Sequence, residues 1–215
     1  MAGNNVLRWI DGAGWLIFSG GTDSSSEVRA LALTRAAADG GVAYIGLDVD
    51  DDEEVLEDMS ELGAPTGYLV NIVTEDDDTI RKRLIDAAII VIPDNFALNE
   101  LRSSLMGAPL EGLKAAFENG AVILIEGAAI TLFGGGMIVN SGDVAEGFGW
   151  VEDALLLPAI TSISQSEVAR IALEAQSVKL AVGIGVGSGL ALGPTGEVEA
   201  WGQKQVTVAL AGAQP

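Results

Sequence analysis

The chain has 215 residues and a formal net charge of −20, from 11 basic and 31 acidic side chains. It contains no cysteine and no histidine, which excludes disulfides, thiolate catalysis, zinc–thiolate sites and any Ser-His or Cys-His relay. The excess of negative charge argues against binding to nucleic acid or to an anionic membrane, and no apolar run reaches the ~18 residues of a membrane span.

The composition favours one folded domain. A hydrophobic fraction of 49% and a mean hydropathy of +0.38 are enough for a full core. The first residues lack the basic start of a secretory signal, so we expect a cytoplasmic protein. Its acidity would keep an apolar chain soluble, and it is also typical of a saline cytoplasm.

The first two thirds of the chain alternate short apolar runs with segments of helical periodicity. Strands are expected at 15–19, 42–47, 68–73, 88–92 and 121–126. Helices are expected at 26–38, 55–62, 79–87, 97–106 and 109–119. Strand–helix repeats with short connections predict a parallel, doubly wound sheet with right-handed crossovers.

Two acidic segments follow predicted strands. Residues 48–54 contain six acidic residues and one valine, and residues 74–78 repeat the pattern. Such a segment is typical of a divalent-cation loop or of an acidic entry into a helix. The second interpretation is favoured, because the spacing lacks the glycine and terminal glutamate of an EF-hand.

The last third changes character. Glycine-rich segments at 133–137 and 147–150 precede an apolar segment at 155–160 and a helix at 166–175. Further apolar runs at 181–186, 189–192, 197–201 and 205–210 predict antiparallel hairpin strands added to one edge of the sheet. The predicted fold is therefore α/β: three α/β/α layers around a mostly parallel sheet with antiparallel C-terminal hairpin strands.

The central strand leads into a distinctive turn. It ends at Glu126, Gly127 permits a sharp turn, and Ala128 to Ile130 open a helix-like run. Strand, tight turn and helix form the geometry of a nucleophile elbow, which presents one side chain at the carboxyl edge of the sheet. Here that side chain is Glu126 or Ile125, and neither is an ordinary hydrolytic nucleophile.

Other short segments add to this pattern. They are the Gly20-Gly21 turn after the first strand, the turn Pro93-Asp94-Asn95-Phe96, the break Met106-Gly107-Ala108-Pro109-Leu110, and the glycine-rich residues 185–192. With these segments the chain resembles the cyanophycinase and aspartyl dipeptidase family of serine hydrolases. The resemblance covers roughly Trp15 to Leu210, and it implies one class I glutamine amidotransferase-like domain over residues 1–215.

The resemblance also implies positions for the family's catalytic residues. Aligned without gaps, the family elbow Gly-Thr-Ser-Ala-Gly-Ala-Ala falls on Ile123 to Ala129, so Ile125 stands at the serine position. Counting back from Arg170 puts Thr161 at the histidine position. The family's acidic pair is missing from residues 185–192. The chain is thus similar to a catalytically degenerate member of this family.

These observations lead to a first hypothesis, a catalytically inactive peptidase-like protein with a binding, assembly or regulatory role. Its cleft would accept an acidic peptide or a small ligand, with no cofactor and no metal, and the resemblance implies a homodimer. Phe148 and Trp150, set among glycines, fit an interface or the core. The candidate cleft residues are Gly20, Gly21, Asp94, Asn95, Glu126 and Gly127.

An alternative hypothesis is an unusual hydrolase. Glu126 and Asp94 follow strands expected to be neighbours, and a pair of carboxylates can carry out acid–base chemistry on acidic or β-aspartyl peptides. Together with Asp48 they could also hold a cation. Two structural interpretations compete with these roles: Asp94 is a common turn residue, and Glu126 could fill the site itself or cap the following helix.

Overall fold

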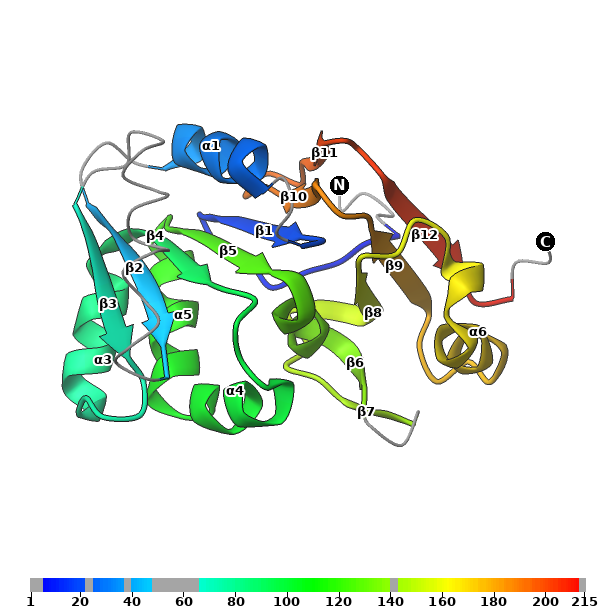
Figure 1. The fold of residues 1–215 in the computed structure, drawn as a ribbon, viewed down its shortest axis with the longest axis horizontal. Helices are drawn as coiled ribbons and strands as arrows, with labels where there is room; N and C mark the ends of the chain where they lie inside the picture. The colour runs from blue at the N-terminus through cyan, green and yellow to red at the C-terminus, as the bar shows by residue number, and fades with distance from the viewer. Residues whose placement is uncertain (1–5, 22–24, 37–39, 48–65, 140–142, 213–215) are drawn as a thin grey trace.

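The computed structural model describes residues 6–21, 25–36, 40–47, 66–139 and 143–212. Its larger sheet has seven strands in the order β11-β10-β1-β5-β4-β2-β3 (Figure 1). Five of them are parallel: β1 (Trp15–Ser19), β2 (Gly41–Gly46), β3 (Gly67–Asn71), β4 (Ala87–Ile92) and β5 (Val122–Glu126). The antiparallel strands β10 (Ser188–Leu192) and β11 (Val198–Gly202) extend this sheet beyond β1. They form one of the C-terminal hairpins that the sequence predicts for the edge of this sheet.

A second sheet has five strands in the order β12-β9-β8-β6-β7. These are β6 (Gly134–Ile138), β7 (Val144–Glu146), β8 (Val151–Pro158), β9 (Leu180–Ile184) and β12 (Val206–Leu210). Strands β6, β8 and β9 are parallel, and the edge strands β7 and β12 are antiparallel to their neighbours. The runs at 181–186 and 205–210 were expected on the first sheet and belong to this one instead.

Glycines explain why the sequence does not reveal the second sheet. Strand β6 begins with three glycines, and glycine contributes no apolar side chain to a periodic pattern. The fold needs these glycines because the backbones approach closely here. A Cβ on Gly135 would lie 2.7 Å from the backbone nitrogen of Asp153, and a Cβ on Gly134 would lie 2.5 Å from the carbonyl oxygen of Ala154.

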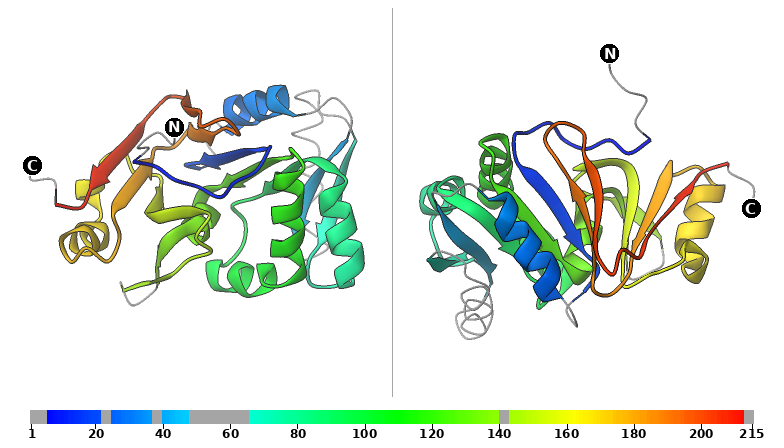
Figure 2. Two further views of the ribbon diagram at one scale, coloured as in Figure 1. Left: turned by 180° about the vertical axis from the view of Figure 1, so that it is seen from behind. Right: turned by 90° about the horizontal axis from the view of Figure 1, so that it is seen from above.

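Helices cover both faces of the seven-stranded sheet, which confirms the α/β/α layers (Figures 1 and 2). The described helices are α1 (Ser25–Arg35), α3 (Asp77–Ile85), α4 (Leu98–Leu105), α5 (Ala108–Glu118) and α6 (Glu167–Glu174), with 3₁₀ helices η1 (Gly127–Phe133) and η2 (Ile163–Gln165). Helix α1 packs against side chains such as Ile17 and Leu124. Helices α3 and α5 pack on the opposite face, and α6 covers the outer face of the second sheet.

The predicted helix at 79–87 is displaced. Helix α3 begins two residues earlier and ends at Ile85, and Ala87 already belongs to β4. The segment 48–54 and the helix expected at 55–62 lie outside the described residues. Within the described part of the chain, no helix is both long and apolar enough to span a bilayer.

Candidate site at the carboxyl edge of the parallel sheet

Three strand ends meet at the carboxyl edge of the parallel sheet. Strand β5 lies between β1 and β4, with Glu126 beside Ser19 and Ile125 beside Ile92. The segments that follow these strands contain the predicted cleft residues Gly20, Gly21, Asp94, Asn95 and Gly127, and Glu126 is the last residue of β5. The sheet therefore brings these segments to one edge, where open α/β sheets bind ligands.

The strained residue of the central turn is Gly127. Its φ is +52°, in the left-handed region that favours glycine, and η1 starts at this residue. In a nucleophile elbow the nucleophile occupies the strained residue between strand and helix. The ungapped comparison placed the serine position at Ile125, but Ile125 lies two residues earlier, fully buried in the main core.

Asp94 covers this turn. The backbone N–H of Ala128 donates to Asp94 Oδ1 at 2.7 Å. A Cβ added to Gly127 would overlap the Asp94 carboxylate, so a larger residue there would displace the Asp94 side chain, and the φ angle of the turn itself favours glycine. Asp94 is exposed to solvent, so its carboxylate forms the surface of the turn.

Glu126 points to the other face of the sheet, beneath α1. Arg29 donates to both of its oxygens, Nε to Oε1 at 2.9 Å and Nη2 to Oε2 at 2.6 Å. The Glu126 side chain is 1% exposed and that of Arg29 is 10% exposed. Glu126 is the N-cap residue of η1, but its side chain makes no capping hydrogen bond. Asp94, which the sequence suggested as a turn residue, an acid–base carboxylate or a cation ligand, accepts the Ala128 N–H there.

Arg29 is the polar residue of this edge that the sequence analysis missed. It follows Val28 and lies three residues before Ala32, both of which are buried in the cluster beneath α1. A charged residue on the apolar face of a predicted helix is a signal that could have identified it, because buried charges need a partner. Ser19 lies beside Glu126 in register, and its buried hydroxyl has no hydrogen-bond partner among the described residues.

The Gly20–Gly21 turn joins the two sheets. The N–H of Ala159 donates to Gly20 O at 2.9 Å, and the N–H of Gly20 donates to Ser188 O at 3.0 Å. A Cβ on Gly20 would overlap the backbone at Gly185, and Gly185 in turn lies beside Thr161. Thr161, the predicted histidine position, is exposed and belongs to this junction. Among the described residues, no hydrogen bond links it to Gly127 or Asp94.

The described residues contain no cluster of three or more acidic side chains that could hold a metal ion. Asp48, the third residue of the suggested cation site, lies outside them. A depression of about 770 Å³ lies elsewhere and is lined by residues that include Trp9, Gly12, Lys114 and Glu118. Gly12 precedes β1 and Glu118 precedes β5, so this depression lies at the amino ends of the strands, opposite the candidate site.

No protein-family model matches the chain, and no curated protein sequence matches it. Solved structures are nevertheless similar. One is a peptidase from an acI-B1 Actinobacterium, with a TM-score of 0.70 and 16% sequence identity over 95% of this chain and 94% of that chain. Another is a putative peptidase E protein from Listeria monocytogenes EGD-e, with a TM-score of 0.63 and 15% identity over 87% of this chain and 97% of that chain. The chain therefore has a peptidase-like α/β fold.

Proposed function

We propose that this chain is a noncatalytic protein on a peptidase-like fold, with a role in binding, assembly or regulation. The observation that carries the proposal is the turn after β5. Its strained position is Gly127, which has no side chain to act as a nucleophile, and the Asp94 carboxylate occupies the space that such a side chain would need. Gly127 and Asp94 together thus leave no space for a nucleophilic side chain at the tip of the turn as it stands.

The remaining chemistry supports the same conclusion. A hydroxyl nucleophile needs a base to accept its proton, and the chain has no histidine. Among the described residues of this edge, Glu126 is a second acidic residue, but both of its oxygens are bound by Arg29 and it is buried. Of these two described carboxylates, Asp94 is therefore the one open to a substrate.

Hydrolysis of a panel of acidic and β-aspartyl dipeptides tests this proposal. The proteins to compare are wild type, Asp94→Asn and Glu126→Gln, with an active peptidase of the same fold as the positive control. We expect no turnover above buffer from any of the three. A fluorophosphonate probe, which labels activated serines, is expected to label the positive control and not this chain.

Two outcomes contradict the proposal, and they differ in meaning. If wild type turns over a peptide and Asp94→Asn does not, the protein is a hydrolase that uses the Asp94 carboxylate. If all three proteins turn over a peptide equally, the reaction takes place outside the turn after β5.

A further inference from the structure

Four side chains meet where the end of α1 lies next to β1 and β11. Arg35 is the last residue of α1, Trp15 is the first residue of β1, and Glu199 and Trp201 belong to β11. Figure 1 shows α1 beside β10 and β11. Because Trp15 stands at the amino end of β1, this group lies at the opposite edge of the sheet from the turn after β5.

The two indole rings form a corner around the Arg35 guanidinium. Its central carbon lies 4.4 Å from the ring centroid of Trp15 and 5.8 Å from that of Trp201. The rings are themselves stacked, with centroids 6.2 Å apart and planes inclined by 30°. The electron-rich face of an indole attracts a cation within about 6 Å, and a planar guanidinium also stacks on it. Both rings therefore attract the same cation.

Glu199 completes this corner as the hydrogen-bond acceptor. Both of its carboxylate oxygens accept from Arg35 Nη2, at 3.1 and 2.8 Å, and Oε2 also accepts the indole N–H of Trp201 at 2.7 Å. Residues 199 and 201 share a face of β11, because side chains alternate along a strand. The indole of Trp201 thus holds the carboxylate in place independently of Arg35.

The two tryptophans are held by contacts that do not involve Arg35. Trp201 is 5% exposed and belongs to the buried cluster that contains Ile17 and Val28, and Trp15 packs against that cluster. The side chain of Arg35, by contrast, is 38% exposed at the end of a helix. The corner therefore combines fixed walls with a cation that lies next to solvent.

We infer that Trp15, Trp201 and Glu199 form a guanidinium-binding site, which Arg35 fills from within the chain. An arginine side chain of a partner occupies the same site when Arg35 turns out to solvent. Lysine fits less well, because its ammonium is compact, strongly hydrated and has no plane to lay on an indole face.

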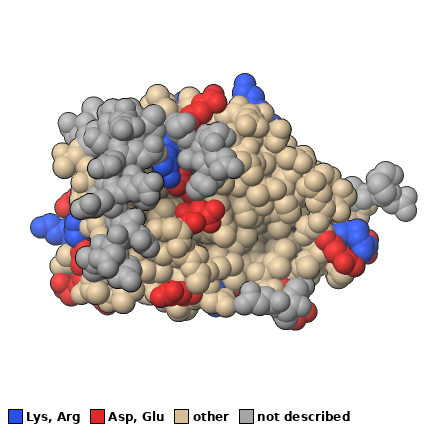
Figure 3. Space-filling model, in the orientation of Figure 1, with Lys and Arg blue, Asp and Glu red and all other residues tan. Residues whose placement is uncertain are grey.

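Charge makes a basic, arginine-bearing segment the fitting partner. The net charge of −20 attracts cationic molecules and repels acidic ones. On the face drawn in Figure 3, the few Lys and Arg groups have acidic groups close by. A second carboxylate, Glu197, lies on the same face of β11 as Glu199 and contacts Arg35 through its charge. The inference does not depend on whether the turn after β5 is catalytic.

Arg35→Ala empties the site and leaves its walls in place. We propose to titrate N-acetyl-arginine amide into wild type and this variant at constant ionic strength, with tryptophan fluorescence as the readout. Saturable binding to Arg35→Ala should be about tenfold tighter than to wild type, because a site that is open for only a fraction of the time binds more weakly by that fraction. N-acetyl-lysine amide should bind Arg35→Ala more weakly than the arginine compound does.

Two further variants show where the ligand binds. Arg170→Ala is the matched control, because it removes an exposed arginine that also pairs with a glutamate, on α6, and it should bind like wild type. Glu199→Gln combined with Arg35→Ala keeps the shape of the acceptor without its charge and should lose binding. An Arg35→Ala protein that binds no more tightly than wild type overturns the inference. Binding that survives Glu199→Gln, or equal binding of the lysine compound, overturns it as well.

Thermal unfolding separates an empty site from a damaged fold. Arg35→Ala should have the circular dichroism of wild type and a lower midpoint, which millimolar methylguanidinium should raise while the wild-type midpoint stays unchanged. Equal changes in both proteins would show a general solvent effect and contradict the inference. Arg35→Gln, which retains more of the side-chain stem, repeats both measurements, so that an unfolded Arg35→Ala still leaves a decisive test.

Discussion

Gly127 and Asp94 depend on each other at the turn after β5. The glycine supplies a positive φ and the space that the carboxylate fills, and the carboxylate accepts the N–H that opens η1. A change of the residue at the tip of the turn therefore also affects Asp94. This coupling can be measured with a pair of substitutions.

Gly127→Ala should destabilise the protein by about 2–4 kcal/mol, because it combines an unfavourable positive φ with an overlap against Asp94. Gly127→Ala combined with Asp94→Ala should recover part of that loss, since the overlap disappears and the φ cost remains. Urea unfolding of the two single variants and the double variant gives the coupling energy. Strict additivity of the two single changes would contradict the packing described for this turn.

The ion pair of Glu126 and Arg29 is buried. The loss of stability should therefore depend on whether one residue of the pair or both are replaced. Glu126→Gln leaves the Arg29 charge buried and should cost about 3 kcal/mol, whereas replacing both residues by methionine should cost less than the two single changes together. The exposed pair of Arg170 and Glu174 is the control, and Glu174→Gln should stay within about 0.5 kcal/mol of wild type. A Glu126→Gln protein as stable as wild type would show that the pair contributes little.

At the scale of elements, the sequence predicts the parallel strands of the first sheet well. Runs such as those at 88–92 and 121–126 are short, apolar and rich in β-branched residues, so they indicate buried strands, and β4 and β5 differ from them by one residue. The glycine-rich start of β6 carries no such signal. Assignment of the runs at 181–186 and 205–210 to a sheet needs long-range pairing that no local pattern contains.

The sequence predicts some features of the candidate site and misses others, again because local patterns do not contain long-range contacts. Strand order alone places Asp94 and Glu126 at one edge, and the structure does the same. The position of the tip depends on a dihedral angle, which residue counting cannot supply, and it falls at Gly127. The partner Arg29 is 97 residues from Glu126 in the chain, so only the fold brings the two together.

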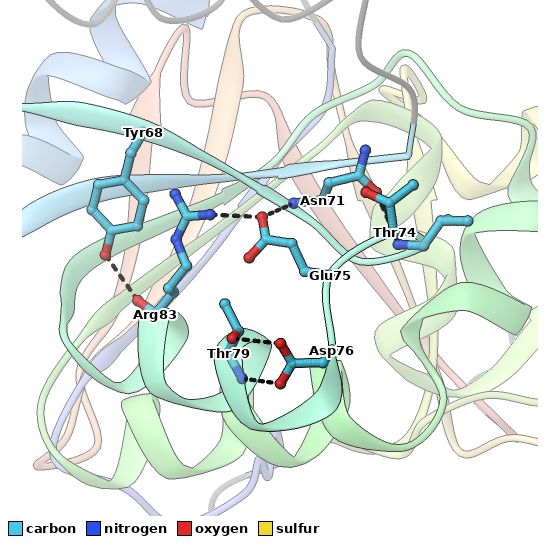
Figure 4. A network of polar contacts seen from close by, with 8 residues as sticks. Tyr68, Asn71, Thr74, Glu75, Asp76, Thr79 and Arg83 are labelled. Atoms are coloured by element: carbon cyan, nitrogen blue, oxygen red, sulfur yellow. Dashed lines mark hydrogen bonds and ion pairs between the residues drawn. The ribbon is translucent and has the colours of Figure 1, made fainter.

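Helix α3 begins with acidic residues, and their contacts show how a local sequence pattern sets the start of a helix. Figure 4 shows Asp76 at its start, where Oδ1 accepts the N–H of Thr79 at 3.0 Å and Oδ2 accepts its hydroxyl at 2.7 Å. Nearby, Arg83 donates to Glu75, and Glu75 also accepts the N–H of Asn71. These contacts connect the end of β3 to α3, as an acidic helix entry predicts.

The hydrogen bond from the Thr79 side chain, followed by that from its backbone, lowers the pKa of Asp76 below its usual 3.8. A carboxyl group whose pKa is lower in the folded state stabilises the fold above its unfolded pKa, and this contribution is lost as the pH falls through the folded pKa. Asp76→Ala should thus be less stable than wild type at neutral pH, and the difference should shrink below about pH 4. Urea midpoints across this range test the prediction, and a constant difference would contradict it.

At the scale of the whole molecule, one apolar core joins the two sheets. The same buried cluster contains Phe18 and Ile123 of the first sheet and Leu156 and Val182 of the second. Neither sheet can expose its inner face without opening that core. A single core of this kind favours one cooperative unfolding unit.

We therefore expect one thermal transition, with tryptophan fluorescence and circular dichroism giving the same midpoint. The midpoint should rise by several degrees as salt is added, because screening weakens the repulsion within a chain of net charge −20. Two separated transitions would show that the sheets unfold independently. A midpoint that falls with salt would show that attractive ion pairs outweigh the repulsion.

The turn after β5 also limits what a single substitution can achieve. A serine at position 127 would meet the carboxylate end of Asp94, an exposed side chain, so Asp94 has to turn away before a hydroxyl can stand at the tip. Even then the chain has no histidine, and a further change must supply a base. A single substitution at the tip therefore creates no activated nucleophile, and hydrolase chemistry at this turn needs combined changes.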